Sequence, residues 1–318
     1  MIAYSGNVAR ETLVSRRAFL ACGSAWLALA AVGEASQSRR TRLVLLGTAG
    51  GPTPKARSAA PAQAIVVGDR IYLVDCGDGV ARQLALAHLP IQQLRAVFIT
   101  HQHSDHNAGY GPLFLLGWAA NRTSPIDAYG PPPLVAMTKS LLEAYRYDIE
   151  LRMADEGRPA LAPLVRPHEI TSAGEVFKDD RVRVTAALAD HPPIRYAFAY
   201  RFDTPDRSIV ISGDTRYSQQ VIDLARGADV LVHEAVSREF WERPDAPQPP
   251  SVVRHILASH TDSVDVGRAA AAAGVGTLVL THLVPTEGPG APTDDQWVAG
   301  VRRHYKGNVI VGKDLLEI

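Results

Sequence analysis

Residues 100–109, THQHSDHNAG, place three histidines and one aspartate within six positions at the end of an apolar run. The run AVFIT at 96–100 is typical of a buried strand, so the motif begins where that strand ends. On the irregular turn that follows, His101 and His103 can point to one side, and Asp105 and His106 to a second position nearby. Imidazoles and carboxylates are ligands that zinc, manganese and iron accept. The fold must therefore bring further ligands to the carboxyl end of this strand.

Short apolar runs rich in β-branched residues alternate with helix-like segments along most of the chain. Two sheets packed face to face, with helices outside, would bury these runs on both sides. We therefore expect an α/β protein with a four-layer αββα sandwich. The Pro-rich segment 236–258 is expected to be a loop over the site. Strands are predicted at 42–47, 63–77 (two strands joined at Gly68-Asp69), 96–100, 181–190, 195–202, 208–213, 228–234, 277–282 and 308–312, and helices at 79–87, 133–153, 217–226, 262–273 and 294–304.

The N-terminal segment is predicted to be an export signal. SRRAFL at 15–20 is followed by an apolar run at 18–32 and then by small residues. This pattern resembles a twin-arginine signal peptide, and a cut after Ala35 fits best. It would divide the chain into a signal at 1–35 and a hydrolase domain at 36–318, which the twin-arginine export machinery would deliver to the periplasm or the medium. The apolar run is shorter than the roughly 20 residues of a membrane span, so no stable membrane anchor is expected. An ordinary signal peptide or a retained anchor is the alternative.

Charge and cysteine content restrict the partners. Lys plus Arg number 33, as do Asp plus Glu, so the formal net charge is zero. Proteins that bind nucleic acid through its phosphates usually carry a basic excess, so we expect a small-molecule substrate and no nucleic acid. Cys22 lies in the predicted signal, which leaves Cys76 without a partner for a disulfide. Cys76 is interpreted as a small buried residue.

Five segments carry a resemblance to a known family. The motif at 100–109 resembles the signature of the metallo-β-lactamase superfamily. Its ribonuclease Z and arylsulfatase branch is similar to this chain in four more places: LGTAGGP at 46–52, LVDCGDG at 73–79, ISGDT at 211–215 and LTHL at 280–283. These segments occur in the family order, and the resemblance spans about residues 42–318. It implies that Asp214 bridges two metals and that His282 is the last ligand.

A third histidine ligand should fall between the first motif and Asp214. His168 in RPHEI and His191 in ADHPPI are the two candidates. His191 is preferred because its segment resembles the His-Pro…Tyr segment of the branch. Asp75 stands in LVDCGDG either as a carboxylate that orients a ligand histidine or as a turn-forming residue, and both interpretations stay open.

The resemblance implies a two-metal site that activates one shared water. Two zinc ions are expected, with manganese or iron as alternatives. The segments VHEAV at 232–236 and SHTD at 259–262 imply that His260 protonates the leaving oxygen and that Glu234 orients it. The alternative for His260 is a residue beside a helix N-cap. One metal would be held by His101, His103 and His191, the other by Asp105, His106 and His282, with Asp214 as the bridge; Asp105, His260 and Glu234 are the catalytic candidates.

The expected reaction is hydrolysis of a small phosphodiester or aryl sulfate ester. Members of the family that process the 3′ end of tRNA carry a long arm after the third histidine. Here residues 192–213 leave no room for one, which together with neutral charge and predicted export argues against tRNA. Alternatives are a hydrolase of lactones or other esters, and an iron-containing redox relative; Asp214 argues against β-lactams. A homodimer is a further expectation. Phe240 and Trp241 are interpreted either as stacking partners of an aryl leaving group or as anchors of their loop.

Overall fold

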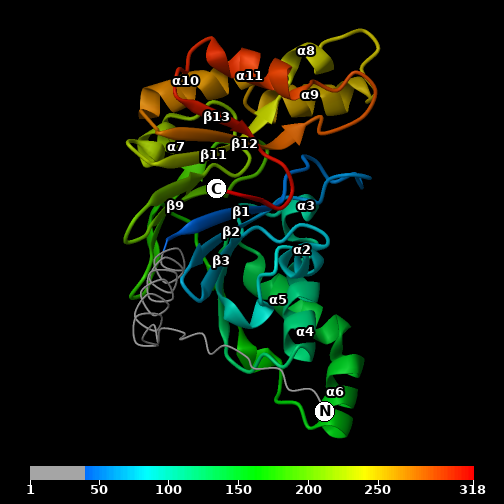
Figure 1. Ribbon diagram of the computed structural model, residues 1–318. Coiled ribbons are helices and arrows are strands. Elements are labelled where there is room, and N and C mark those ends of the chain that lie inside the picture. Colours follow the sequence, from blue (N-terminus) through cyan, green and yellow to red (C-terminus); the bar gives the residue numbers. More distant parts are fainter. Residues whose placement is uncertain (1–39) are drawn as a thin grey trace, which may run out of the picture. The chain divides into compact units, whose positions relative to one another are not determined.

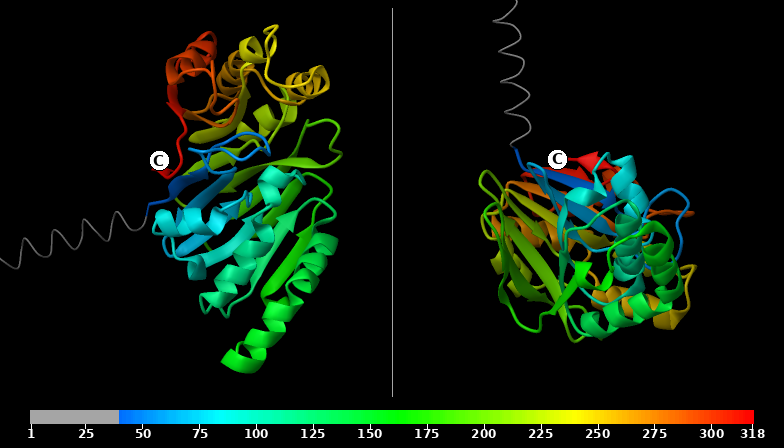
Figure 2. Two further views of the ribbon diagram at one scale, coloured as in Figure 1. Left: turned by 90° about the vertical axis from the view of Figure 1, so that its right-hand side faces the viewer. Right: turned by 90° about the horizontal axis from the view of Figure 1, so that it is seen from below.

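The computed structural model describes residues 40–318, and Thr41–Ile318 form one compact unit. The signal peptide predicted at 1–35 lies outside the described residues. Within those residues, no helix has the length and apolar character needed to cross a bilayer. The chain builds two seven-stranded sheets that face each other, with helices on the outer side of each (Figure 1; Figure 2).

The two sheets contain all the strands predicted from sequence and add several more. Four strands, at 126–130, 165–169, 174–178 and 316–317, were not predicted. The one at 165–169, β6, contains a proline, which is tolerated because β6 is an edge strand. In spatial order, the first sheet consists of β14 (Leu316–Glu317), β1 (Arg42–Gly47), β2 (Ala62–Val67), β3 (Arg70–Val74), β4 (Leu94–Phe98), β5 (Ile126–Gly130) and β6 (Val165–Glu169). The second consists of β13 (Asn308–Val311), β12 (Thr277–Val284), β11 (Val230–Val236), β10 (Ser208–Ile211), β9 (Ala197–Asp203), β8 (Arg183–Ala189) and β7 (Gly174–Lys178).

Three apolar cores explain why the strands are apolar on both faces. In β1, Leu43 and Leu45 face the core between the sheets, whereas Val44 faces the core under the helices of the first sheet. In β10, Ile209 faces the core between the sheets and Val210 the core under the helices of the second sheet. Alternate side chains of one strand thus enter different cores, as the two-residue period of a strand requires. The predicted αββα sandwich is confirmed.

The helices cover the outer faces of the sheets. Helices α2, α4 and α5 pack on the first sheet, and α7, α10 and α11 on the second (Figure 1). The helices are α2 (Val80–Leu86), α3 (Ser104–Asn107), α4 (Tyr110–Ala119), α5 (Leu134–Ala144), α6 (Arg146–Glu156), α7 (Gln219–Ala225), α8 (Arg238–Trp241), α9 (Pro250–Ser259), α10 (Ser263–Ala273) and α11 (Asp294–Arg302), with short 3-10 turns at Ile91–Gln93 and Ala162–Leu164.

Two sequence predictions about helices were wrong. The single helix predicted at 133–153 is two helices, α5 and α6, which meet at Tyr145 with φ −97° and ψ 8°. The segment 236–258, predicted to be a loop, contains α8 and most of α9. Pro250 is the first residue of α9, a position where proline favours a helix because its missing N–H would have no partner there.

Parallel strand pairs place the carboxyl ends of several strands at one edge. In the first sheet β3 is parallel to β4, and in the second β10, β11 and β12 are parallel to one another. Loops that follow these ends meet where the two sheets come together, and an isolated bridge between Ala49 and Leu283 joins the sheets there. The site motifs named above lie on these loops and strand ends.

Candidate metal centre

Three stretches of chain contribute the four residues of the first cluster. His101 and His103 follow β4, His191 lies between β8 and β9, and Asp214 follows β10. Their ligand atoms lie within 4.8 Å of one another. His103 Nδ1 lies 3.0 Å from His101 Nε2 and 3.2 Å from His191 Nε2. The structure thus brings together the residues that the sequence assigned to one metal.

A second cluster consists of Asp105, His106 and His282, whose ligand atoms also lie within 4.8 Å of one another. Asp105 and His106 belong to the short helix α3, and His282 comes from β12. His282 Nε2 lies 3.3 Å from Asp105 Oδ2. All three residues are buried, so their polar atoms are shielded from bulk water.

Asp214 lies between the two clusters. Its Oδ2 atom is 3.8 Å from His101 Nε2 in the first cluster, and 3.4 Å and 3.2 Å from the Nε2 atoms of His106 and His282 in the second. Its side chain is only 3 % exposed. One carboxylate oxygen is therefore within reach of both clusters, which is the geometry that a bridging ligand needs.

The conformation at His282 is unusual for a strand. Its φ is +43°, in the left-handed region that non-glycine residues rarely adopt. The pairing of β11 with β12 shifts register beside it, between Glu234 and Ala235. A bulge of this kind re-aims a side chain and is common next to functional sites. Here it turns the imidazole of His282 toward Asp105 and Asp214.

In the first cluster, the pKa shifts leave side chains in the protonation states that a divalent cation binds. Burial holds the pKa of His101 well below its usual value and lowers the pKa of His103 to about 4. Burial likewise lowers the pKa of His191. Burial disfavours ionised Asp214, but His282 and His106 outweigh it and hold the pKa of its carboxyl well below normal. Three neutral imidazoles and an anionic carboxylate are what a divalent cation binds.

The hydrogen bonds at the outer nitrogens test whether a cation fits. His191 Nδ1 donates to the carbonyl oxygen of Ser259 at 2.9 Å, and His101 Nδ1 donates to Thr100 Oγ1 at 3.0 Å. Both Nε2 atoms therefore carry a lone pair, and both face His103 Nδ1. A proton on His103 Nδ1 could satisfy only one of them, whereas a cation at their centre would satisfy all three nitrogens. His106 Nε2 and Asp214 Oδ1 are also buried without a hydrogen-bond partner. The residues fit metal ions.

Asp75 orients the second cluster. Its Oδ2 accepts a hydrogen bond from His106 Nδ1 at 2.7 Å, and its Oδ1 accepts one from the backbone N–H of Thr100 at 2.8 Å. The Asp75 side chain thus fixes the tautomer of His106 that leaves Nε2 free. The structure therefore favours the orienting role for Asp75, although its φ of +61° shows that it also forms a turn.

Replacing Asp75 by asparagine is expected to weaken metal binding by about 10- to 100-fold. The amide keeps an oxygen for Thr100 but cannot accept the proton of His106 Nδ1. Competition with a chromogenic chelator measures the change. Asp127→Asn is the matched control, because Asp127 also accepts a hydrogen bond from a histidine, His168, on the first sheet away from the centre. Equal metal affinity in the Asp75 variant and the wild type would refute the orienting role.

His260 and Glu234 form a pair beside the second cluster. His260 Nδ1 lies 3.3 Å from Glu234 Oε2, and Glu234 Oε1 accepts hydrogen bonds from the backbone N–H groups of Thr261 at 2.9 Å and Thr215 at 3.3 Å. Burial disfavours a charge on His260, but Glu234 and Asp214 outweigh it and raise its pKa to about 9. His260 is thus held protonated at neutral pH next to Asp214. His260 is the C-cap residue that follows α9, and the N-cap of the next helix, α10, is Asp262.

A cavity of about 570 Å³ opens above the two clusters. Its walls are mainly apolar, and they include Trp241, Ile256 and the glycine-rich turn at Gly50 and Gly51. Phe240 and Trp241 are each 6 % exposed and pack in a small core with Val236 and Val284. These aromatic rings therefore anchor their segment, and both also line the cavity. This volume is typical of sites that bind small molecules.

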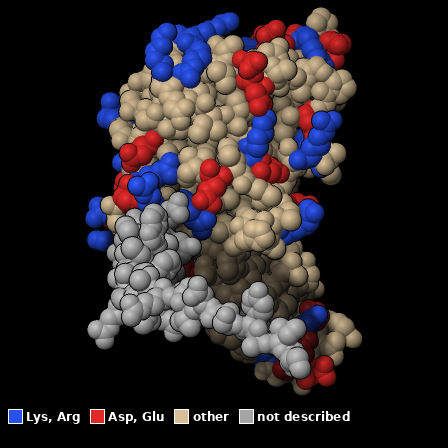
Figure 3. Space-filling model, viewed as in Figure 1, with Lys and Arg blue, Asp and Glu red and all other residues tan. Residues whose placement is uncertain are grey.

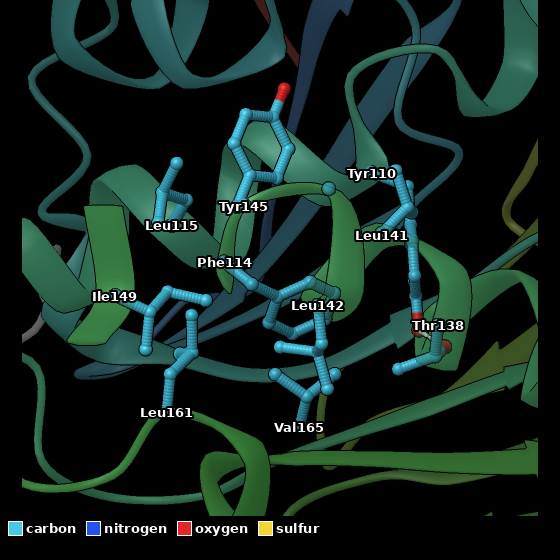
Figure 4. A pocket seen from close by; sticks show the side chains of 11 residues that line it. Tyr110, Phe114, Leu115, Thr138, Leu141, Leu142, Tyr145, Ile149, Leu161 and Val165 are labelled. Carbon is cyan, nitrogen blue, oxygen red and sulfur yellow. Dashed lines mark hydrogen bonds between the residues drawn. The ribbon is translucent and has the colours of Figure 1, made fainter. Parts of the chain in front are cut away.

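A second apolar cavity lies between α4, α5 and α6 (Figure 4). Leu141, Leu142, Ile149 and Leu161 point into it, and its only polar contact among the drawn side chains is the hydrogen bond between Tyr110 and Thr138. Its volume of about 20 Å³ is close to that of a single water molecule. It carries no reactive group, so it is a packing defect and not the site.

Two residues that line the cavity, His255 and Lys55, were not predicted from the sequence, and one candidate ligand, His168, lies elsewhere. His168, the other candidate for the third histidine, sits on β6 and hydrogen-bonds Asp127. His255, which belongs to none of the motifs recognised in the sequence, lines the cavity with Lys55. His255 lies five residues before His260 in the sequence. This position indicates a place near the site only once 250–259 is recognised as a helix.

Comparison with known proteins places the chain in a family. A model described as "Beta-lactamase superfamily domain" matches residues 70–283. A protein named ribonuclease Z from Mycobacterium bovis (strain BCG / Pasteur 1173P2) is 34 % identical over 276 residues, covering 86 % of this chain and 96 % of that protein. A ribonuclease Z from Mycobacterium sp. (strain KMS) is 36 % identical over 275 residues, covering 86 % and 94 %.

Solved structures show the same fold at lower identity. A metallo-beta-lactamase fold protein of Bacillus subtilis superposes with a TM-score of 0.65 at 23 % identity, over 87 % of this chain and 98 % of that one. The short form of human tRNase Z superposes with a TM-score of 0.63 at 20 % identity, over the same shares of the two chains.

Proposed function

Because the chain belongs to the metallo-β-lactamase superfamily, we propose that its imidazole and carboxylate clusters serve a metal-dependent hydrolase that cleaves a phosphodiester bond in RNA. The observation that carries this proposal is one carboxylate oxygen, Asp214 Oδ2, within reach of histidines from both clusters. Relatives that align along most of the chain and are named ribonuclease Z supply the substrate class.

Two expectations from the sequence were wrong. We had expected a small phosphodiester or aryl sulfate, with tRNA processing disfavoured, and no nucleic-acid partner. The ribonuclease Z names of relatives at 33 % to 36 % identity overturn both. The absence of a long arm does not exclude tRNA as a substrate. The 276 aligned residues cover 96 % of the Mycobacterium bovis protein, so that protein has little length left for such an arm. Net charge was also a poor argument, because it says nothing about contacts inside a cavity.

The chain's own residues divide the work as follows. One cation would be held by His101, His103 and His191, and the other by Asp105, His106 and His282. Both cations would be bound by Asp214. Zinc is the proposed metal, since neutral imidazoles with carboxylates suit it. Two such cations supply a water with a pKa near 7 and neutralise charge on the phosphate.

Proton delivery is assigned to His260. Glu234 Oε2 lies 3.3 Å from Nδ1, which leaves Nε2 for the substrate. Because its pKa is raised to about 9, the ring carries the proton that a departing alkoxide needs at neutral pH. Glu234, held by two backbone N–H groups, is the positioning residue for this ring.

Removal of metal is the test of the proposal. The purified protein is incubated with an oligoribonucleotide, a transfer-RNA precursor and bis(4-nitrophenyl) phosphate, before and after treatment with a chelator. We expect hydrolysis to require the metal and to return when zinc or manganese is added. At about a hundred-fold excess over Kd, each bound ion should also stabilise the fold by about 2 to 3 kcal/mol, which calorimetry detects as a higher melting temperature.

Two results would contradict the proposal. One is full activity in metal-free protein. The other is a metal-loaded protein that cleaves no phosphodiester. The twin-arginine signal and the periplasmic location stay predictions of the sequence.

A further inference from the structure

A stripe of three side chains on α9 faces the cavity and has no role in the site described so far. Val252, His255 and Ile256 are spaced i, i+3 and i+4, so they share one face of the helix, and all three line the cavity. Val252 is 37 % exposed. The neighbouring positions Val253 and Leu257 pack against the small core around Trp241, and Ile256 contacts both this core and the cavity. Helix α9 therefore presents one face to its own core and another to the cavity.

The stripe is held at a fixed distance from the metal centre. The carbonyl oxygen of Ser259, the last residue of α9, accepts the hydrogen bond from His191 Nδ1 at 2.9 Å. The ring of His255 lies 6.3 Å from the rings of both His103 and His191, centroid to centroid. His260 follows the helix directly. A movement of α9 would therefore disturb a proposed metal ligand as well as the proton donor.

The chemistry of the stripe suits a flat, uncharged ring. Two aliphatic side chains and an imidazole carry no permanent charge, so they offer a phosphate little attraction. An imidazole face and branched aliphatic groups are good surfaces for a nucleobase, because every base has a π-face. The glycine-rich turn at Gly50 and Gly51 lines the same cavity, and its residues carry no side chain that would fill this space.

The charged side chains on the face drawn in Figure 3 are of mixed sign. The formal net charge is zero, and on the face drawn in Figure 3 cationic and anionic side chains are interspersed over the described residues. A protein without a basic field gains little affinity from phosphates at long range. Affinity for a nucleotide substrate must then come from contacts close to the scissile bond.

We propose that the stripe Val252, His255 and Ile256 is the subsite for the nucleobase of the nucleoside that carries the leaving oxygen. This inference rests on the proposed function, in which His260 gives its proton to that oxygen. Because His260 and the stripe line the same cavity, the group attached to that oxygen shares this cavity with the helix. The stripe would select substrates by the base at this one nucleoside.

Product analysis first identifies the nucleoside that is released with a new hydroxyl. The test then compares two oligoribonucleotides that differ only at that nucleoside. One has its base and the other has hydrogen at C1′. Wild-type protein loaded with zinc should prefer the first by about ten-fold or more in kcat/KM. His255→Ala, and the double variant V252A/I256A, should reduce this preference several-fold. Val253→Ala is the matched control on the same helix and should keep the preference. Metal content and melting temperature are measured for each variant.

Each outcome decides the question. Equal cleavage of both oligoribonucleotides by the wild type overturns the subsite and leaves the proposed function standing. An equal loss of preference in the Val253 variant also overturns it, because the effect would then come from the packing of α9. Cleavage of neither substrate by metal-loaded wild type overturns the proposed function and the subsite with it.

Discussion

Asp214→Asn should lower the hydrolysis of every phosphodiester substrate by more than about 100-fold, since even residues that only orient metal ligands cost 10- to 100-fold when removed. Asp214 Oδ2 lies within 4.0 Å of His101, His106, His191 and His282, and the amide replaces a buried anion by a neutral group. The four histidines then lose the negative charge that balances two cations. Elemental analysis should show that the variant no longer binds two metal ions per chain.

The size of the side chain is unchanged in Asp214→Asn, so the fold is expected to persist, and circular dichroism and thermal melting check this. Asp223→Asn is the control, because Asp223 lies on α7 and is paired on the surface with Arg226. A variant of Asp214 that binds two metals and turns over at the wild-type rate would remove the basis of the proposed function.

His260→Ala is expected to lower kcat by about 100- to 10,000-fold on RNA, which is the range that a positioned proton donor contributes. The loss should be far smaller on bis(4-nitrophenyl) phosphate, because nitrophenolate leaves without a proton. Metal content should not change, since His260 is not among the seven proposed ligands. His304→Ala, at an exposed histidine beyond α11, is the control.

The pH dependence of RNA hydrolysis tests the same role of His260. The pKa of His260 is raised to about 9, so the protonated ring is present below that pH and is lost as the pH rises through it. Cations bound beside Asp214 repel this charge and move the descending limb to lower pH. Glu234→Gln removes the largest stabilising charge and should move it lower still. A descending limb that stays in place in His260→Ala would mean that another group donates the proton.

Much of the fold was readable because its strands are buried on both faces. Apolar runs such as 42–47 and 208–211 remain recognisable without knowledge of their partners, since each face of the strand enters a core. The break at Tyr145 was not readable, because no proline or glycine marks it and α5 and α6 each continue a helical pattern. The Pro-rich stretch before α9 was misinterpreted, because a proline that ends one helix can equally begin another.

The candidate site was partly readable for a similar reason. His101, His103, Asp105 and His106 lie within six residues, so local chain geometry alone keeps them near one another. The role of Asp75 could not be decided from sequence, because a turn and a hydrogen bond to His106 require the same residue type. Only the pairing of β3 with β4 brings the two residues together.

By itself, the sequence determined the donor types, the motif after β4 and the alternation that builds two sheets. The tertiary structure decided that His191 and not His168 lies in the first cluster, that a bulge turns His282 toward Asp105 and Asp214, and that α9 lines the cavity. The physical reason is distance along the chain. Residues a few positions apart are held by backbone geometry, whereas His101 and His282 meet only because the carboxyl ends of strands from two packed sheets share one edge.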